Sequence, residues 1–400
     1  PVPGTNKYYL HSFHKDQPDL NWQNPVLREE IYKMINWWLD KGIAGFRIDA
    51  IINIKKDLEW RSLPSDRDNG LVPVPESLVN AQPIEPFLQE LKERTFAKYN
   101  AFTVGEVFNE TDEELHFFIG KDGVFSSIFD FKQTMLGQEG KGWFDHALPT
   151  ADELKESIFQ AHERADSIGI LSTIIENHDE PRGVSHYIAE GPVNDTSKKA
   201  LGTIQILRKG IPFIYQGQEI GMENQVFESV EDFDDIATIN GYHVAKEAGL
   251  SEEEALAAIA NYSRDNARTP MQWSAEPGLG FSDGSAWLIS PKPNVAINVE
   301  DQEKDPNSIL NYYRQLTALY RHPLYGNTIR FGDMIPAYRD RENIIAFERR
   351  GDKRLLVVSN FQNRQATLEL PAPIKTVVLN NTAGLFQEGD QVLELVPYQT

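Results

Sequence analysis

Short apolar segments alternate with amphipathic helical segments through roughly the first half of the sequence, and this alternation constrains the fold most. Helical patterns separate consecutive apolar segments, so the strands are expected to run parallel and the helices to cover them. The order predicts an α/β fold built on a parallel sheet. The five strand candidates are GFRIDAI (45–51), FTVGEV (102–107), SIFDF (127–131), ILSTIIE (170–176) and PFIYQGQE (212–219).

The helices between these strands carry start signals. Asn24 followed by Pro25 predicts the beginning of a helix that Gly42 ends. Thr111 with Glu114 matches a capping box, in which each residue's side chain satisfies the other's backbone N–H. Further helices are expected over about 86–99, after Thr150 and over about 197–208.

The pattern changes at about Gly326. From there the sequence reads as short strands separated by turn residues, without a helical pattern between them. This predicts a small antiparallel β domain over 326–400. Its strand candidates are NIIAFERR, KRLLVVSNF, QATLEL, KTVVLN and QVLELVPY.

Charge and composition exclude several classes of partner. Lys plus Arg number 39 against 60 Asp plus Glu, a formal net charge of −21 that repels nucleic acid and anionic membrane surfaces. No apolar run approaches the roughly 20 residues of a membrane span. The absence of cysteine excludes disulfides and thiolate metal sites and fits a reducing cytosol. We therefore expect a cytoplasmic protein without nucleic-acid or membrane partners.

Ionisable residues stand where three of the predicted strands end. Asp49 ends the first strand, Glu106 the second, and Asp179 follows the fourth within ENHDEPR (176–182). The carboxyl ends of parallel strands in an α/β barrel meet on one face, so the three carboxylates are expected to converge. Such a set suits glycoside hydrolysis, in which one carboxylic acid protonates the leaving oxygen and a carboxylate attacks or activates water.

Arg47 precedes Asp49 by two residues and should point to the same face of its strand. It would hold Asp49 ionised, as a nucleophile requires. Taken singly, these residues favour structural interpretations: an ion pair for Arg47 and Asp49, a hydrogen-bonded structural role for His178, and a helix cap or turn for Asp179. Carboxylate clusters also bind Mg²⁺ or Ca²⁺. The three strand ends in order favour the catalytic interpretation.

GFRIDAI, VGEVF and ENHDEPR together resemble three ordered catalytic motifs of glycoside hydrolase family 13, the α-amylase family. The segments QPDLN (17–21) and SRDNARTPMQW (263–273) are similar to signatures of its oligo-1,6-glucosidase and α-glucosidase subfamily. GIPFIYQGQEIGM (210–222) resembles the last barrel strand, and the resemblance covers essentially the whole chain.

The resemblance implies a retaining mechanism of double displacement. Asp49 matches the nucleophile that forms a β-glucosyl-enzyme intermediate, and Glu106 matches the general acid and then base. Asp179 matches the third carboxylate, which grips sugar hydroxyls and favours the distorted transition state. The glucose subsite and the arginine that closes the pocket are matched by Arg47, His178 and Arg268.

A closed pocket implies release of single glucose units from non-reducing ends. The expected substrates are short neutral oligosaccharides with α-1,6 or α-1,4 bonds, such as isomaltose, isomalto-oligosaccharides and maltose. The alternatives are a trehalose-6-phosphate hydrolase, or a transglucosylase or sucrose-active enzyme, of the same family. A remote alternative is a non-catalytic binding subunit, although such proteins lose the carboxylates that stand here.

The family fold is a (β/α)8 TIM barrel followed by a small antiparallel β-sandwich domain. The resemblance places residues 1–23 at the end of the inserted domain B, 24–325 in barrel strands 4 to 8, and 326–400 in the β domain. Strands 1 to 3 are then absent, and we expect activity to need that N-terminal part of the same barrel. No cofactor is expected for the chemistry; a structural calcium site, if any, would lie in the missing part.

Two positions depart from the subfamily pattern. Ala50 follows the expected nucleophile, where the pattern has valine in α-1,6-specific members and threonine in many α-1,4-specific ones. Alanine leaves the preferred linkage open. FKQTMLGQEG (131–140) replaces the arginine-rich loop of sucrose isomerases, which favours hydrolysis over isomerisation.

Overall fold

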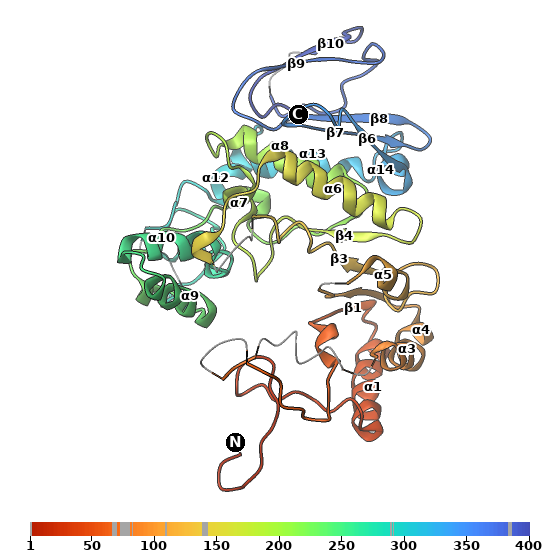
Figure 1. Cartoon of the computed structure of the whole chain (residues 1–400). Coiled ribbons are helices and arrows are strands. Elements are labelled where there is room, and N and C mark those ends of the chain that lie inside the picture. Colours follow the sequence, from red (N-terminus) through yellow and green to blue (C-terminus); the bar gives the residue numbers. More distant parts are fainter. Residues whose placement is uncertain are drawn as a thin grey trace. The chain divides into compact units, whose positions relative to one another are not determined.

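Two compact units make up the chain, residues 1–129 with 164–171 and residues 130–163 with 172–400. Both are seen in a computed structural model of the chain (Figure 1). Residues 138–140, the end of FKQTMLGQEG, lie outside the described part of the chain. The described residues are 2–65, 70–72, 81, 83–108, 110–137, 143–288, 290, 292–382 and 386–400.

The first unit is built on three parallel strands. Ile48 of β1 lies opposite Gly105 of β2, and Gly105 lies opposite Ile128 of β3. The parallel arrangement predicted from the alternation is therefore confirmed in this unit. Its elements are α1 (Pro25–Asp40), β1 (Gly45–Ile48), η1 (Ile51–Ile54), α3 (Glu85–Arg94), α4 (Phe96–Tyr99), β2 (Phe102–Gly105), α5 (Asp112–Phe118) and β3 (Ser127–Phe129).

The predicted helix starts are confirmed. The Asn24 side chain accepts a hydrogen bond from the N–H of Val26, and both halves of the capping box at Thr111 and Glu114 are present. The single helix predicted over 86–99 is divided, because Thr95 leaves helical geometry at φ −130° and ψ −87°. The division separates α3 from α4.

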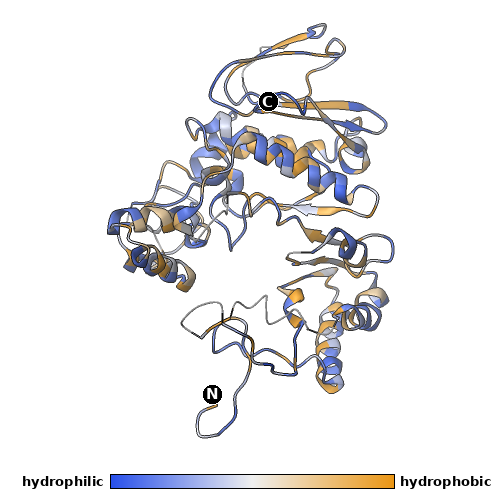
Figure 2. Cartoon of the chain, viewed as in Figure 1, coloured by the Kyte–Doolittle hydropathy of each residue, from blue (hydrophilic) through white to orange (hydrophobic). Residues whose placement is uncertain are grey.

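The second unit holds the remaining parallel pair and most of the helices. Ser172 of β4 lies opposite Ile211 of β5, and both strands are shorter than their apolar segments predicted. The helices show hydrophilic and hydrophobic residues side by side in Figure 2, as helices with one buried face do. The elements up to residue 319 are η2 (Trp143–Asp145), α6 (Ala151–Ala165), β4 (Leu171–Thr173), α7 (Gly183–Tyr187), α8 (Asp195–Leu207), β5 (Ile211–Pro212), η3 (Gln218–Ile220), η4 (Val230–Asp232), α9 (Ile236–Glu247), α10 (Glu252–Tyr262), α11 (Asp265–Arg268), η5 (Pro277–Gly280), α12 (Val299–Lys304) and α13 (Ile309–Leu319).

The C-terminal strands pair antiparallel, as predicted. One sheet has the order β6-β7-β8 and another pairs β9 with β10. Two local predictions are wrong: residues 326–331 form helix α14, and KTVVLN forms no strand, with Val377 and Val378 both exposed. A β-branched run alone does not make a strand when it has no buried face. The elements are α14 (Gly326–Phe331), β6 (Asp333–Ala337), β7 (Ile344–Arg350), β8 (Arg354–Asn360), β9 (Ala366–Glu369) and β10 (Val392–Leu395).

One core joins the helices of the second unit to the C-terminal sheet. Helices α8 and α13 lie against the sheet of β6, β7 and β8 (Figure 1). The sheet is therefore packed into the same apolar cluster as the helices. Its fully buried members include Ala200, Leu201, Ile204, Leu316, Ile345 and Phe347.

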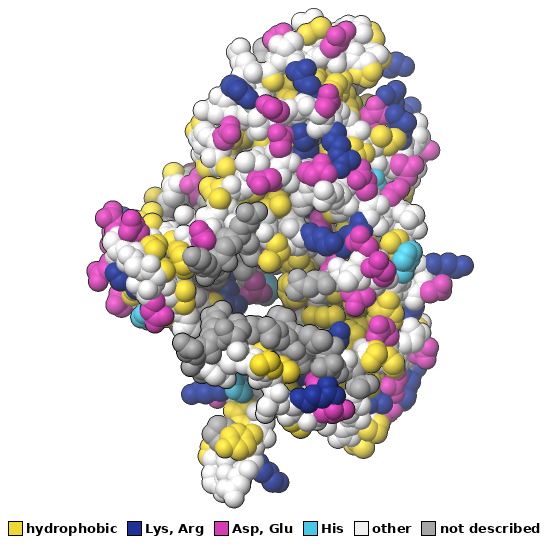
Figure 3. Space-filling model, in the orientation of Figure 1, with side chains coloured by type: hydrophobic (Ala, Val, Ile, Leu, Met, Phe, Trp, Pro, Cys, Tyr) yellow, Lys and Arg dark blue, Asp and Glu magenta, His cyan; other side chains and the backbone are white. Residues whose placement is uncertain are grey.

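The surface in view carries charges of both signs. Figure 3 shows acidic side chains scattered over the visible face, with lysines and arginines between them. Among the residues that the structure describes, no helix combines the length and apolar character needed to cross a membrane.

Candidate active site

Asp49 and Glu106 end neighbouring strands at the same level. The register pairs Ile48 with Gly105, and each carboxylate residue directly follows its strand. The N–H of Glu106 donates to the carbonyl of Ile48 at 2.9 Å, which continues the ladder by one step. The prediction that these two residues stand at strand ends is confirmed, and their side chains hydrogen-bond to each other.

Arg47 joins the two carboxylates. Its guanidinium forms the predicted ion pair with Asp49, and its Nη2 also lies 2.8 Å from Oε1 of Glu106. The Glu106 side chain is buried, whereas the Asp49 side chain is 73% exposed. The two carboxyl groups thus share one cation but differ strongly in solvent access.

Burial raises the pKa of Glu106 to about 7, and the hydrogen bond from Asp49 adds to the rise. The backbone N–H of Ala50, which donates to Oε2 of Glu106 at 2.7 Å, and the positive charge of Arg47 oppose it. A carboxyl group with this pKa holds a proton near neutral pH, as a general acid must.

Ala50 has a left-handed backbone, with φ 41° and ψ 37°. This conformation turns the chain directly after Asp49 into η1 and aims the Ala50 N–H at Glu106. It is unfavourable for residues with a Cβ and worst for β-branched ones. The backbone here therefore disfavours the valine or threonine of the subfamily pattern.

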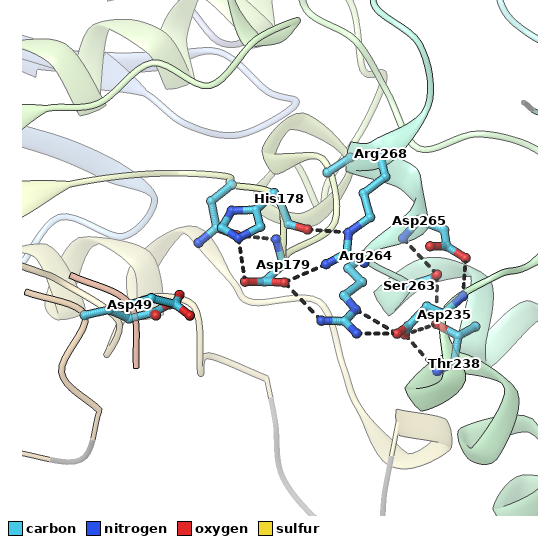
Figure 4. Close-up of polar contacts among 12 residues, drawn as sticks. Asp49, His178, Asp179, Asp235, Thr238, Ser263, Arg264, Asp265 and Arg268 are labelled. Atoms are coloured by element: carbon cyan, nitrogen blue, oxygen red, sulfur yellow. Dashed lines mark hydrogen bonds and ion pairs between the residues drawn. The ribbon is translucent and has the colours of Figure 1, made fainter. Parts of the chain in front are cut away.

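A second cluster surrounds Asp179 in the second unit (Figure 4). Oδ1 of Asp179 accepts from Arg268 Nη2 at 2.7 Å and from Arg264 Nη1 at 3.0 Å, while Oδ2 lies 3.0 Å from Nε2 of His178. Arg268 also donates from Nε to the carbonyl of His178 at 2.8 Å. The structure therefore brings His178, Asp179 and Arg268 together.

Arg264 is part of this cluster, although it was not predicted as a site residue from the sequence. It stands four residues before Arg268 within SRDNARTPMQW, a spacing that places two side chains on one face of a helical turn. The four-residue spacing from Arg268 could have identified Arg264 as a site residue. No comparable sequence pattern identifies its partner Asp235, at the start of α9.

Other charges of ENHDEPR have structural roles. Glu176 and Arg182 form a buried ion pair, with Arg182 Nη1 2.9 Å from Oε1 of Glu176. The second carboxylate oxygen of Glu176 accepts the N–H of Gly183 at 2.7 Å. Arg182 also donates to the carbonyl of Gln216 at 2.8 Å. These contacts fix both ends of the loop that presents His178 and Asp179.

The predicted carboxylates fall in different units: Asp49 and Glu106 in the first, Asp179 in the second. Their convergence stays a prediction. Within the described part of the chain, no group of three or more His, Asp or Glu side chains is arranged to hold a metal ion.

Comparison with known proteins places the chain among carbohydrate enzymes. The family model of the α-amylase catalytic domain matches residues 3–324. Probable oligo-1,6-glucosidase 3 of Bacillus subtilis is 40% identical over 319 residues, 79% of this chain and 56% of the relative. Oligo-1,6-glucosidase of Halalkalibacterium halodurans is 38% identical over 383 residues, 94% of this chain and 68% of the relative.

A solved structure shows the same fold. The crystal structure of the isomaltulose synthase from Protaminobacter rubrum superposes with a TM-score of 0.89 at 30% identity, covering 99% of this chain and 71% of that one. The parallel sheet with covering helices is thus part of a TIM-barrel-like fold, followed by an antiparallel sheet domain. The chain spans about 56% to 68% of the length of the two curated relatives. The family match covers most of the chain, and we conclude that it belongs to the α-amylase family, glycoside hydrolase family 13.

Proposed function

We propose that this chain is the catalytic part of a retaining, exo-acting α-glucosidase. It would hydrolyse terminal α-1,6- or α-1,4-linked glucose from short oligosaccharides through a β-glucosyl-enzyme intermediate. The observation that carries the proposal is the pair of carboxylates at the ends of β1 and β2, one exposed and one buried with its pKa raised to about 7. Two oligo-1,6-glucosidases among the relatives support the same reaction and linkage class.

The proposed roles follow from these environments. Asp49, paired with Arg47 and exposed, is the nucleophile. Glu106 holds its proton near neutral pH and gives it to the leaving oxygen, then takes a proton from water in the second step. The proposed role of Asp179 is that of the carboxylate that binds sugar hydroxyls, with His178 and Arg268 beside it.

The fold assignment supports a finer proposal for the barrel. Strands β1 to β5 correspond to barrel strands 4 to 8, and residues 1–23 to the return from the inserted domain. Among the described residues, β1 pairs with β2 alone, and α1 exposes Met34, Trp37 and Trp38. An open strand edge and exposed aromatic side chains in the same unit fit a sheet that further N-terminal barrel strands continue. We propose that activity needs them.

Neither the nucleophile nor the acid in this scheme uses a cofactor, and we propose that none is required for the chemistry. A cytoplasmic location is proposed on the cysteine-free composition.

The nucleophile assignment is tested in the active enzyme that contains this chain. Asp49→Asn should lower kcat on aryl α-glucosides by several orders of magnitude, because an amide cannot form the covalent intermediate. Circular dichroism and the melting temperature should stay close to those of the wild type, since the Asp49 side chain is exposed. Near wild-type turnover by Asp49→Asn would refute the assignment.

The reaction class is tested by its products. The wild-type enzyme should release α-glucose from isomaltose or maltose, and freshly released β-glucose would contradict retention. Sucrose and trehalose-6-phosphate assayed in parallel test the alternatives: formation of isomaltulose, or preferential cleavage of trehalose-6-phosphate, would replace the proposed specificity.

A further inference from the structure

The buried carboxylate of Asp235 lies behind the Asp179 cluster. It comes from the N-terminal end of α9, far in sequence from the loop that follows β4, and its side chain is fully buried. Oδ1 of Asp235 accepts from Nε of Arg264 and also lies 2.7 Å from Nη2 of the same guanidinium. The other edge of that guanidinium reaches Asp179, so one arginine bridges the two carboxylates (Figure 4).

Asp235 is itself held rigidly. Its Oδ2 accepts from the N–H of Thr238 at 2.9 Å and from the Thr238 hydroxyl at 2.8 Å. Its backbone N–H donates to Oδ2 of Asp265 at 2.9 Å, and the Thr238 hydroxyl lies 2.9 Å from the hydroxyl of Ser263. The contacts to Thr238 hold Asp235 at the start of α9, and the contacts to Asp265 and Ser263 tie that start to the segment that carries Arg264.

The energetics favour a fixed, charged Asp235. Burial alone would raise the pKa of Asp235, but the hydrogen bonds from Thr238 and Arg264 outweigh it and lower that pKa. A buried carboxylate that stays ionised needs its cation in place, because an unpaired buried charge is strongly unfavourable. Arg264 is about one-third exposed and would otherwise be free to choose rotamers.

We infer that Asp235 is a positioning residue that acts through Arg264 to fix the orientation of Asp179. The inference rests on the proposed function, in which Asp179 binds the sugar most strongly in the transition state. Arg268 and Arg264 both donate to the same oxygen of Asp179. Oδ2, the other oxygen, lies beside His178, and the inference assigns to this side of Asp179 the contact with substrate. Loss of Asp235 releases Arg264, and Asp179 loses one of its two fixed donors.

Asp235→Asn separates this role from helix capping. Asparagine caps helices as well as aspartate and can still accept from Thr238, but it offers no negative charge to Arg264. We expect kcat on an aryl α-glucoside to fall roughly 10- to 100-fold, the scale of a misplaced catalytic group. KM should change much less, because the contribution of Asp179 grows in the transition state.

A double-mutant cycle with Arg264→Met tests the path of the effect. If Asp235 acts through Arg264, Arg264→Met should lower kcat to a similar extent, and adding Asp235→Asn should lower it no further. Full additivity of the two losses would overturn the inference. If Asp235→Asn does not fold, the Arg264→Met variant is sufficient for the test, because a wild-type kcat in that variant would overturn the inference.

Glu348→Gln provides the matched control. Glu348 is a buried carboxylate of β7 that accepts from Arg350 and Arg354 in the C-terminal sheet. Its loss should lower the melting temperature and leave kcat unchanged, and an equal loss of kcat would show that Asp235→Asn reports general destabilisation. If the wild-type enzyme cleaves no α-glucoside, the proposed function fails; if it is active and Arg264→Met keeps wild-type kcat, only the positioning role fails.

Discussion

At the scale of single residues, different surroundings give two chemically similar carboxylates different proposed roles. Asp49 and Glu106 hydrogen-bond to each other and share the cation of Arg47. Burial acts on Glu106 alone, and the exposed Asp49 keeps contact with water. This asymmetry favours a proton on Glu106 and suits a nucleophile and an acid side by side.

The raised pKa of Glu106 predicts the pH dependence of catalysis. The acid works while protonated, so kcat/KM should fall as pH rises through about 7. Because Asp49 and Glu106 interact, the apparent pKa measured from this fall describes the pair and not Glu106 alone. Glu106→Gln should lower kcat/KM strongly and abolish this alkaline limb, as a pH profile with an aryl α-glucoside would show. An alkaline limb that persists in the variant's residual activity would assign it to another group.

The same shift makes a prediction for stability. Folding raises the pKa of Glu106 from about 4.5 to about 7, so its contribution to stability is fully present below about 4.5 and is lost as pH rises through about 7. Glu106→Gln should flatten the pH dependence of the melting temperature in that window. An unchanged pH dependence would contradict the shift.

The left-handed backbone of Ala50 predicts different effects of two substitutions on stability. Ala50→Val should destabilise the fold by more than about 1 kcal/mol, because a β-branched residue is strained at φ 41°, whereas Ala50→Gly should not. If position 50 also sets linkage preference, Ala50→Val should raise activity on isomaltose relative to maltose. Melting temperatures test the strain, and an unchanged isomaltose-to-maltose ratio would remove the linkage proposal.

At the scale of elements, the pairing of β1 with β2 sets the level at which Asp49 and Glu106 stand. The two strands approach so closely that a Cβ on Gly45 would lie 1.8 Å from the carbonyl oxygen of Phe102. Backbone cannot give way there as a flexible side chain could. The glycine at the start of β1 therefore matters to the site at its other end.

Gly45→Ala should consequently weaken both fold and activity. Relief of the clash requires the strands to part, and we expect a loss of about 1–3 kcal/mol in the free energy of unfolding together with reduced kcat. Gly284→Ala is the control, because Gly284 has no backbone atom near its Cβ position and no left-handed φ. Equal melting temperatures for the two variants would contradict the close approach.

At the scale of the whole molecule, the second unit and the C-terminal sheet share one apolar core. Ile345 and Phe347 of β7 are fully buried in the cluster that also contains Leu201 and Ile204 of α8. Arg349, buried in the same strand, donates to the carbonyls of Leu207 and Gly332 at 2.8 Å each. The sheet is thus a structural part of the unit that holds Asp179.

Removal of residues 326–400 should therefore unfold more than the sheet. Apolar faces of α8 and α13 would be exposed to water, and loss of soluble protein or of the cooperative thermal transition is expected. Sedimentation and differential scanning calorimetry measure both. A truncated chain with the wild-type melting temperature would show that the sheet is an independent appendage.

The sequence alone determined the class of fold and the positions of Asp49 and Glu106 at the ends of the first two strands. Apolar periodicity and capping residues act locally, so Asn24, Thr111 and the segment GFRIDAI were sufficient to predict two helix starts and the first strand of a parallel sheet. Asp49 and Glu106 follow their strands directly, which is why their positions could be inferred without coordinates. KTVVLN shows the limit of this reasoning, because burial, and not propensity, decides whether such a run pairs.

Only the tertiary structure decided the charges and partners of the site. The pKa of Glu106 depends on burial and on contacts from Arg47, Asp49 and Ala50, which no spacing in the sequence measures. The bridge from Asp235 through Arg264 to Asp179 links residues 29 and 85 positions apart in the sequence, and it forms only after α9 is in place. Electrostatic energies depend on distance and solvent access in three dimensions, and for that reason they belong to the fold and not to the local sequence.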